Sequence, residues 1–151
     1  MEEKDGIDGP VLIIDDQLEF YHTCIKDLKR RGYEVTCACS VEEARELILD
    51  RELNFRAVLL DLMMPSGPYD KEASQSGRRT GILLLGEIVV SRPRLPVIIA
   101  SVMAGEPNIR QELLGYSSVK EFLVKPFGPK EIIDTLGKIK VEAKGERSWL
   151  E

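Results

Sequence analysis

The stretch Val11-Leu12-Ile13-Ile14-Asp15-Asp16 joins four apolar residues to two carboxylates. A continuous apolar run of this length is typical of a strand in a parallel sheet whose two faces are covered by helices. Three similar runs occur further along the chain, and each precedes a reactive side chain: Val58-Leu59-Leu60 before Asp61, Val97-Ile98-Ile99-Ala100 before Ser101, and Phe122-Leu123-Val124 before Lys125. Because parallel strands share one carboxyl edge, the sequence predicts that these side chains meet there.

Helical patterns separate the predicted strands, and a further strand is expected over residues 33–39. Ser40 and Glu43 form a capping box, which indicates the start of a helix. The other four helices are expected to begin near Leu18, Gly81, Pro107 and Pro129. This alternation predicts an α/β fold of the (βα)5 flavodoxin-like type, a three-layer sandwich around a parallel five-stranded sheet with the probable order 2-1-3-4-5.

Length and composition fit one domain that carries a net negative charge. The chain has 151 residues and a formal charge of −5, which favours a single domain and argues against direct binding to nucleic acid. No stretch approaches 18 apolar residues, so we expect no membrane segment and a cytoplasmic location. The three cysteines form no CxxC pair, which argues against a disulfide framework and against a zinc site.

The predicted edge brings together the carboxylates of Asp15, Asp16 and Asp61. Three carboxylates in a partly desolvated site repel one another unless a cation joins them, and Mg²⁺ is the hard cation that prefers oxygen ligands. A carboxylate beside Mg²⁺ can attack phosphorus and form an acyl phosphate. Asp61 is the best candidate nucleophile, and Lys125 and Ser101 are placed to neutralise charge on the phosphoryl oxygens.

The ordered set of motifs resembles the receiver domain of two-component response regulators. The resemblance rests on Val11-Leu12-Ile13-Ile14-Asp15-Asp16, on Asp61-Leu62-Met63-Met64-Pro65, on Ser101 and on Lys125-Pro126-Phe127, in this order and at about the family's spacing. It implies a receiver domain over residues 10–141, with an inserted loop at about 66–79 and flexible termini at 1–9 and 142–151. It also implies a cis peptide bond between Lys125 and Pro126.

The resemblance implies a role for each matching residue. Asp61 is the expected phospho-acceptor, and Lys125 is expected to pair with the phosphoryl group. The expected ligands of Mg²⁺ are Asp16 directly, Asp15 mainly through water, Asp61 itself and the backbone carbonyl of Met63. Ser101 and Phe122 are the expected switch: the hydroxyl hydrogen-bonds the phosphoryl group, and the aromatic ring changes rotamer with it.

The function implied is that of a phospho-accepting signalling switch. A sensor histidine kinase or a phosphotransfer protein would donate the phosphoryl group, and the changed surface would control an effector protein or an output domain. Such a protein is not an enzyme in the usual sense, because it catalyses only its own Mg²⁺-dependent phosphorylation and dephosphorylation. The output surface, and the surface of a phosphorylation-dependent homodimer, would consist of the fourth helix, the fifth strand and the fifth helix.

The chain departs from the family pattern in the length of one loop and at Val102, where the family usually has a small alanine. Pro65 and Gly81 are sixteen residues apart, where the family has about four, so about a dozen residues are inserted. The polar insert is expected to be a solvated flexible loop, with a flap that contacts a partner as the alternative. Met63 and Met103 lie at the positions that modulate water attack on the phosphoryl group in the family, and both are apolar, which predicts slow self-dephosphorylation.

Two other functions are compatible with the fold. An aspartyl-phosphate hydrolase of the haloacid-dehalogenase type would need a second aspartate two residues after Asp61, where this chain has Met63. A phosphate-independent docking module would keep the receiver-like fold without accepting phosphate. The sequence favours the phospho-accepting switch over both.

Overall fold

A computed structural model describes residues 9–150, with side chains for residues 9–140. Five parallel strands form one sheet in the order β2-β1-β3-β4-β5, which confirms the predicted topology. In chain order the strands are β1 (Val11–Ile14), β2 (Val35–Ala38), β3 (Ala57–Leu60), β4 (Val97–Ser101) and β5 (Val119–Val124).

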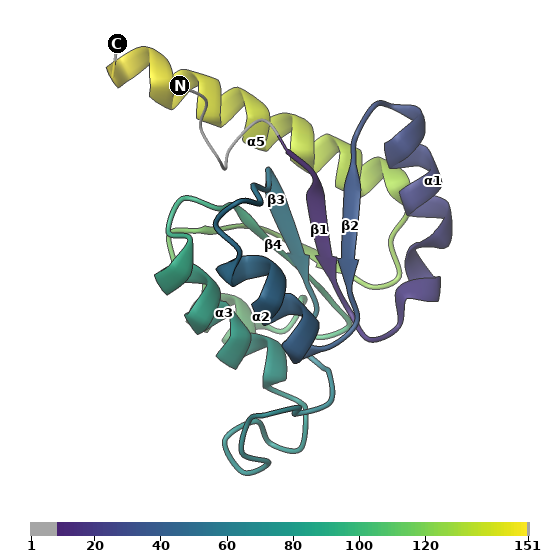
Figure 1. Cartoon of the computed structure of the whole chain (residues 1–151), viewed down its shortest axis with the longest axis vertical. Helices are drawn as coiled ribbons and strands as arrows, with labels where there is room; N and C mark the ends of the chain where they lie inside the picture. Colours follow the sequence, from purple (N-terminus) through teal and green to yellow (C-terminus); the bar gives the residue numbers. More distant parts are fainter. Residues whose placement is uncertain (1–8, 151) are drawn as a thin grey trace.

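Helices cover both faces of the sheet, so the molecule has the predicted three layers (Figure 1). The helices are a short 3-10 helix η1 (Leu18–Tyr21), α1 (His22–Arg30), α2 (Val41–Leu49), α3 (Thr80–Ser91), α4 (Pro107–Leu113) and α5 (Pro129–Leu150). At the start of α2, the Ser40 hydroxyl accepts a hydrogen bond from the Glu43 amide at 3.1 Å, as the predicted capping box requires, whereas the Glu43 carboxylate accepts one from the Cys39 amide at 2.8 Å.

Alternate residues of the central strands supply two separate cores. In β1, Leu12 and Ile14 face the cluster that includes α2, α3 and α4, whereas Val11 and Ile13 face the cluster that includes α1 and α5. All four side chains are fully buried. This explains why the strand reads as an unbroken apolar run: both of its faces are covered, so neither face needs polar residues.

The inserted segment 66–79 is a loop of turns with mostly exposed residues, and a few of its side chains anchor it to the domain. Ser74 within it is fully buried, and its hydroxyl lies 2.7 Å from the Ser66 hydroxyl. The phenol of Tyr69 hydrogen-bonds Glu87 of α3, which also forms a two-bond ion pair with Arg45 of α2 at 2.8 Å. The composition of the insert is polar, but these polar groups bond to one another and to the neighbouring helices.

The structure describes the C-terminal end of the chain more fully than the N-terminal end. The sequence places the end of the domain at residue 141, whereas α5 continues past that point to Leu150. Residues 142–150, predicted as part of a flexible terminus, are therefore helical in backbone. Of the other predicted flexible terminus, residues 1–8 lie outside the described residues. Over residues 9–150, no helix has the length and apolar character that a membrane crossing requires.

Candidate functional site at the carboxyl edge of the sheet

Three carboxylates meet where β1 and β3 end. Asp15 and Asp16 follow the last residue of β1, and Asp61 follows the last residue of β3, the strand that pairs with β1. One carboxylate oxygen from each lies within 4.8 Å of the others. Asp15 is fully buried, Asp61 is 6% exposed and Asp16 is exposed to solvent. The predicted acidic cluster is therefore present, and it opens to solvent at Asp16.

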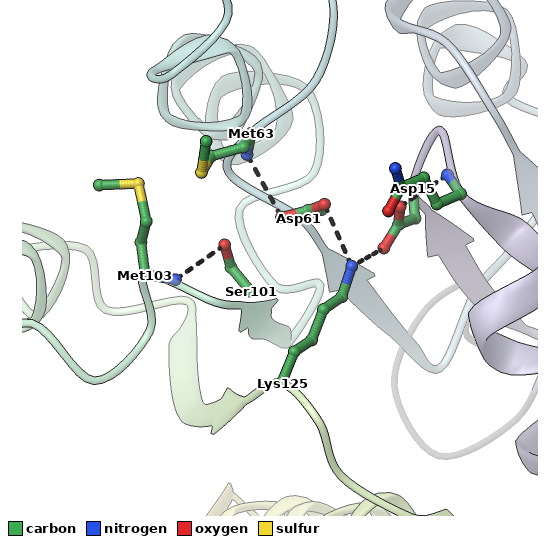
Figure 2. Close-up of polar contacts among 7 residues, drawn as sticks. Asp15, Asp61, Met63, Ser101, Met103 and Lys125 are labelled. Carbon is green, nitrogen blue, oxygen red and sulfur yellow. Dashed lines mark hydrogen bonds and ion pairs between the residues drawn. The ribbon is translucent and has the colours of Figure 1, made fainter.

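Lys125 reaches into this cluster from the end of β5. Its Nζ lies 2.5 Å from Asp15 Oδ2 and 3.3 Å from Asp61 Oδ2, and Figure 2 shows the amine between the two carboxylates. Burial disfavours the charge on this lysine, but the hydrogen bonds and the attraction of the two aspartates outweigh it and raise the pKa of Lys125. The amine therefore stays positively charged and partly neutralises the buried acids.

The environment of the buried Asp15 carboxylate disfavours its negative charge. Burial raises its pKa, and the charge of Asp61 raises it further, although hydrogen bonds from Lys125 and from the Gln17 amide lower it. The net direction is upward, so a bound cation would relieve a real electrostatic cost. Within the described part of the chain, the candidate metal ligands are these three carboxylates, with no histidine or cysteine among them, so the residues present fit a hard ion such as Mg²⁺.

Ser101 ends β4 and is fully buried beside this edge of the sheet. Its hydroxyl accepts a hydrogen bond from the Met103 amide at 3.3 Å, and its carbonyl accepts one from the Lys125 amide at 3.1 Å. The Met63 amide donates to Asp61 Oδ1 at 3.2 Å. Figure 2 shows the side chains of Met63 and Met103 on the same side of the site, away from Asp15.

Gly81, at the start of α3, allows the insert to return close to Asp61. Its amide donates to the Leu62 carbonyl at 2.9 Å. A Cβ atom built on Gly81 would lie 2.0 Å from the Asp61 carbonyl oxygen, which is far inside van der Waals contact. Only glycine fits at this position, because any side chain would collide with the backbone at Asp61, twenty residues earlier in the chain. Its role at the site is therefore one that the sequence does not show.

Phe122, the predicted switch aromatic, is half-buried in β5, and the Arg110 guanidinium lies over its ring. The guanidinium carbon of Arg110 in α4 is 5.2 Å from the centre of the Phe122 ring. The Arg110 Nε also donates to the Ala104 carbonyl at 2.7 Å, in the loop that follows Ser101. One side chain thus contacts both the loop after Ser101 and Phe122. Sequence reasoning missed Arg110, because an isolated arginine in a short helix carries no recognisable signal.

The Lys125–Pro126 peptide bond is cis, as the resemblance implied. The model for the response regulator receiver domain family matches residues 11–137, which is most of the chain. The chain belongs to this family.

Curated relatives include both a protein of similar length and longer proteins. The chemotaxis protein CheY of Thermotoga maritima is 29% identical over 131 residues, which cover 85% of this chain and 95% of that protein. The transcriptional regulatory protein SrrA of Staphylococcus aureus is 27% identical over 124 residues, covering 82% of this chain. The match spans only 44% of SrrA, so the receiver domain corresponds to less than half of that relative.

Solved structures share the fold at lower sequence identity. A CheY-like receiver domain from Methanospirillum hungatei JF-1 superimposes with a TM-score of 0.72 at 22% identity, covering 91% of this chain and 98% of the other. The response regulator TrrA of Thermotoga maritima, solved in complex with Mg(2+)-BeF, gives a TM-score of 0.65 at 23% identity, with 87% and 99% covered. These likenesses show that the fold is that of receiver domains.

The structure brings most of the predicted site residues together. Asp15, Asp61 and Lys125 are in contact, Asp16 completes the acidic cluster, and Ser101 lies at the end of the adjacent strand. The roles of the Met63 carbonyl as a metal ligand and of Phe122 as a moving switch stay predictions.

Proposed function

We propose that this receiver domain is a phospho-accepting switch in which Asp61 takes a phosphoryl group from the phosphohistidine of a sensor histidine kinase or a phosphotransfer protein. The observation that carries this proposal is the Lys125 amine, held between Asp15 and Asp61 at the mouth of an acidic site. A cation at this place can pair with the oxygens of an incoming phosphoryl group. A docking module without chemistry would have no need of a buried charge cluster, which is costly to maintain.

In the transfer, an Asp61 carboxylate oxygen forms a bond to phosphorus while the nitrogen–phosphorus bond of the donor breaks. The imidazole nitrogen keeps the electron pair of that bond and takes up a proton from solvent. Mg²⁺, held by Asp15, Asp16 and Asp61 and in the proposal by the Met63 carbonyl, would supply positive charge to the phosphoryl oxygens. Lys125 supplies a second positive charge from its position beside Asp61.

The signal would arise when Ser101 leaves its present hydrogen bond. In the phosphorylated state its hydroxyl turns to the phosphoryl oxygen, and the ring of Phe122 changes rotamer with it. Both residues contact α4 or the loop before it, so the change reaches the surface made by α4, β5 and α5. That surface is the proposed site for an effector protein, an output domain or a phosphorylation-dependent homodimer.

The proposal makes the domain a signalling protein rather than an enzyme, acting in the cytoplasm on no substrate other than itself. Its phosphorylated state is proposed to be long-lived. The apolar side chains of Met63 and Met103 lie on the same side of the site, where they offer no polar group to orient an attacking water (Figure 2). Exchange of either for a polar residue, as in Met63→Asn or Met103→Lys, is expected to shorten the lifetime.

The proposal is tested by intact mass after incubation with Mg²⁺ and acetyl phosphate. The wild type is expected to gain one phosphoryl group in a Mg²⁺-dependent manner, and Asp61→Asn is expected to gain none. Asp70→Asn, which changes an exposed aspartate of the insert, serves as the matched control and should be phosphorylated like the wild type. A folded wild type that gains no mass would instead favour the phosphate-independent docking module.

A further inference from the structure

Two aromatic rings of η1 lie beside the Lys125 amine, and a third ring, on the segment that carries the lysine, packs against them. The Lys125 Nζ is 5.0 Å from the centre of the Phe20 ring and 5.9 Å from that of Tyr21, both in η1. Phe127, two residues after the lysine, packs edge-on against Phe20 with 5.2 Å between ring centres, and its ring centre lies 6.0 Å from that of Tyr21. The ring contacts therefore connect η1, which follows Asp15 and Asp16, to the segment that contains Lys125.

The Lys125 amine contacts both carboxylates and aromatic rings. The carboxylates of Asp15 and Asp61 attract it into the acidic mouth, and the Lys125 side chain is only 11% exposed. An ammonium that has lost most of its water gains from an aromatic face within about 6 Å, and such contacts are strongest where they are desolvated. Phe20 is the nearer ring and is half-buried, so it is the main aromatic partner of this cation.

We propose that Phe20, assisted by Tyr21, is a positioning residue that holds the Lys125 ammonium beside Asp61 for phosphoryl transfer. The inference rests on the proposed function, since it assigns a further residue to the same reaction. Phe20 touches neither the carboxylates nor the phosphoryl group in this scheme and acts only through the lysine. Without the ring, the four-carbon side chain of Lys125 would sample more orientations, and the fraction with its amine beside Asp61 would fall.

The first part of the test does not depend on phosphorylation. Protons that lie over an aromatic ring face are shifted upfield in NMR spectra, so the ε-methylene of Lys125 should resonate upfield of the other lysines. Phe20→Leu should remove most of that shift, and Phe20→Trp should keep it. An unshifted Lys125 ε-methylene in the wild type would overturn the proposal, whether or not the domain accepts phosphate.

The second part measures the rate of phosphorylation by acetyl phosphate with saturating Mg²⁺. Phe20→Leu should slow it by roughly 5- to 30-fold, and Phe20→Trp should restore most of the rate. Phe127→Leu is the matched control. It removes a ring of the same cluster, but among residues 9–140 only the Phe20 and Tyr21 rings lie against the Lys125 amine. Its rate should stay within about twofold of the wild type.

A purely structural role for Phe20 would give a different pattern. Phe20→Leu and Phe127→Leu would then lower the rate in proportion to their loss of thermal stability, and that result would overturn the proposal. In a Lys125→Ala background, Phe20→Leu should add no further loss, since the residue it positions is gone. An additional loss there would also count against the proposal. A wild type with the expected NMR shift but no phosphorylation would contradict the proposed function and, with it, the catalytic part of this inference.

Discussion

Arg110 covers the ring of Phe122 and at the same time holds the backbone of the loop after Ser101. The guanidinium lies 5.2 Å from the ring centre, and its Nε donates to the Ala104 carbonyl at 2.7 Å. Because Ala104 lies in the same loop, we expect these two contacts to stabilise the arrangement in which the Ser101 hydroxyl accepts from the Met103 amide. In the proposed switch, Arg110 therefore favours the unphosphorylated state.

Arg110→Ala should make the switch easier to turn on. Loss of the cation–π contact and the hydrogen bond removes about 1 kcal/mol that favours the present state, so phosphorylation by acetyl phosphate should become roughly fivefold faster. The control is Arg30→Ala, which removes an exposed arginine paired with Asp27 on α1. A slower reaction in a folded Arg110→Ala protein would show that the arginine supports the active state instead.

The ion pair of Lys125 with Asp15 should compete with metal binding. A bound Mg²⁺ and the Lys125 amine would repel each other, and the amine now lies 2.5 Å from an Asp15 oxygen. Lys125→Ala should therefore tighten Mg²⁺ binding by roughly tenfold, as measured by isothermal titration calorimetry. Lys130→Ala is the matched control, because Lys130 is exposed on α5 and pairs only with Asp134 among the described residues. Equal affinities in the two variants would contradict this competition.

Asp15→Asn should stabilise the metal-free domain at neutral pH. A raised pKa means that the folded state holds the proton of Asp15 more tightly than the unfolded state, so ionised Asp15 costs stability at pH 7. The variant should therefore be more stable than the wild type in urea unfolding with a chelator present. The gain should shrink as the pH falls through the raised pKa and vanish below the ordinary value of 3.8.

The control for that series is Asp134→Asn. The Lys130 amine lowers the pKa of Asp134, so this exposed carboxylate should favour folding when ionised, and its loss should not stabilise the domain at pH 7. A loss of stability in Asp15→Asn at pH 7 would mean that the bond to Lys125 outweighs the burial of the charge.

Two glycines of α3 should respond in opposite directions to alanine. Gly81→Ala places a methyl group 2.0 Å from the Asp61 carbonyl oxygen, so it should cost about 3 kcal/mol and displace the acceptor strand end. The methyl group of Gly86→Ala would have no atom within 4 Å apart from the neighbouring backbone of its own helix, so the variant should gain about 0.5–1 kcal/mol from helix propensity. Urea unfolding of both variants checks the pair. A Gly81→Ala protein as stable as the wild type would contradict the close approach.

Tyr69→Phe should loosen the insert while leaving the fold intact. The phenol bonds Glu87 and the ring lies 5.0 Å from the Arg45 guanidinium, so the variant loses the hydrogen bond but keeps the ring. Amide hydrogen exchange over residues 66–79 should become about fivefold faster. The control is Tyr33→Phe, because the Tyr33 ring also lies near a guanidinium, 4.8 Å from that of Arg56, but lies outside the insert. This variant should leave amide hydrogen exchange in the insert unchanged.

The sequence by itself determined the fold class and the main site residues. The strand order 2-1-3-4-5 was predicted only as the common solution for such an alternation, and the structure decided it. Strands buried on both faces read as unbroken apolar runs, and in a parallel sheet all strand ends with the same polarity lie at one edge. Asp15, Asp61, Ser101 and Lys125 follow or end such runs, so their meeting follows from topology alone. For this reason the acidic cluster could be located without coordinates.

Only the tertiary structure decided what supports those residues. The supporting contacts join side chains from different elements and follow no repeating pattern in the sequence. The Arg110 guanidinium lies over Phe122, the Lys125 amine lies over Phe20, and Tyr69 contacts Glu87 and Arg45. A polar insert reads as a loop because composition reports only how many polar groups it has. Whether those groups bond to water or to the domain depends on which helices lie beside them, and folding alone sets that arrangement.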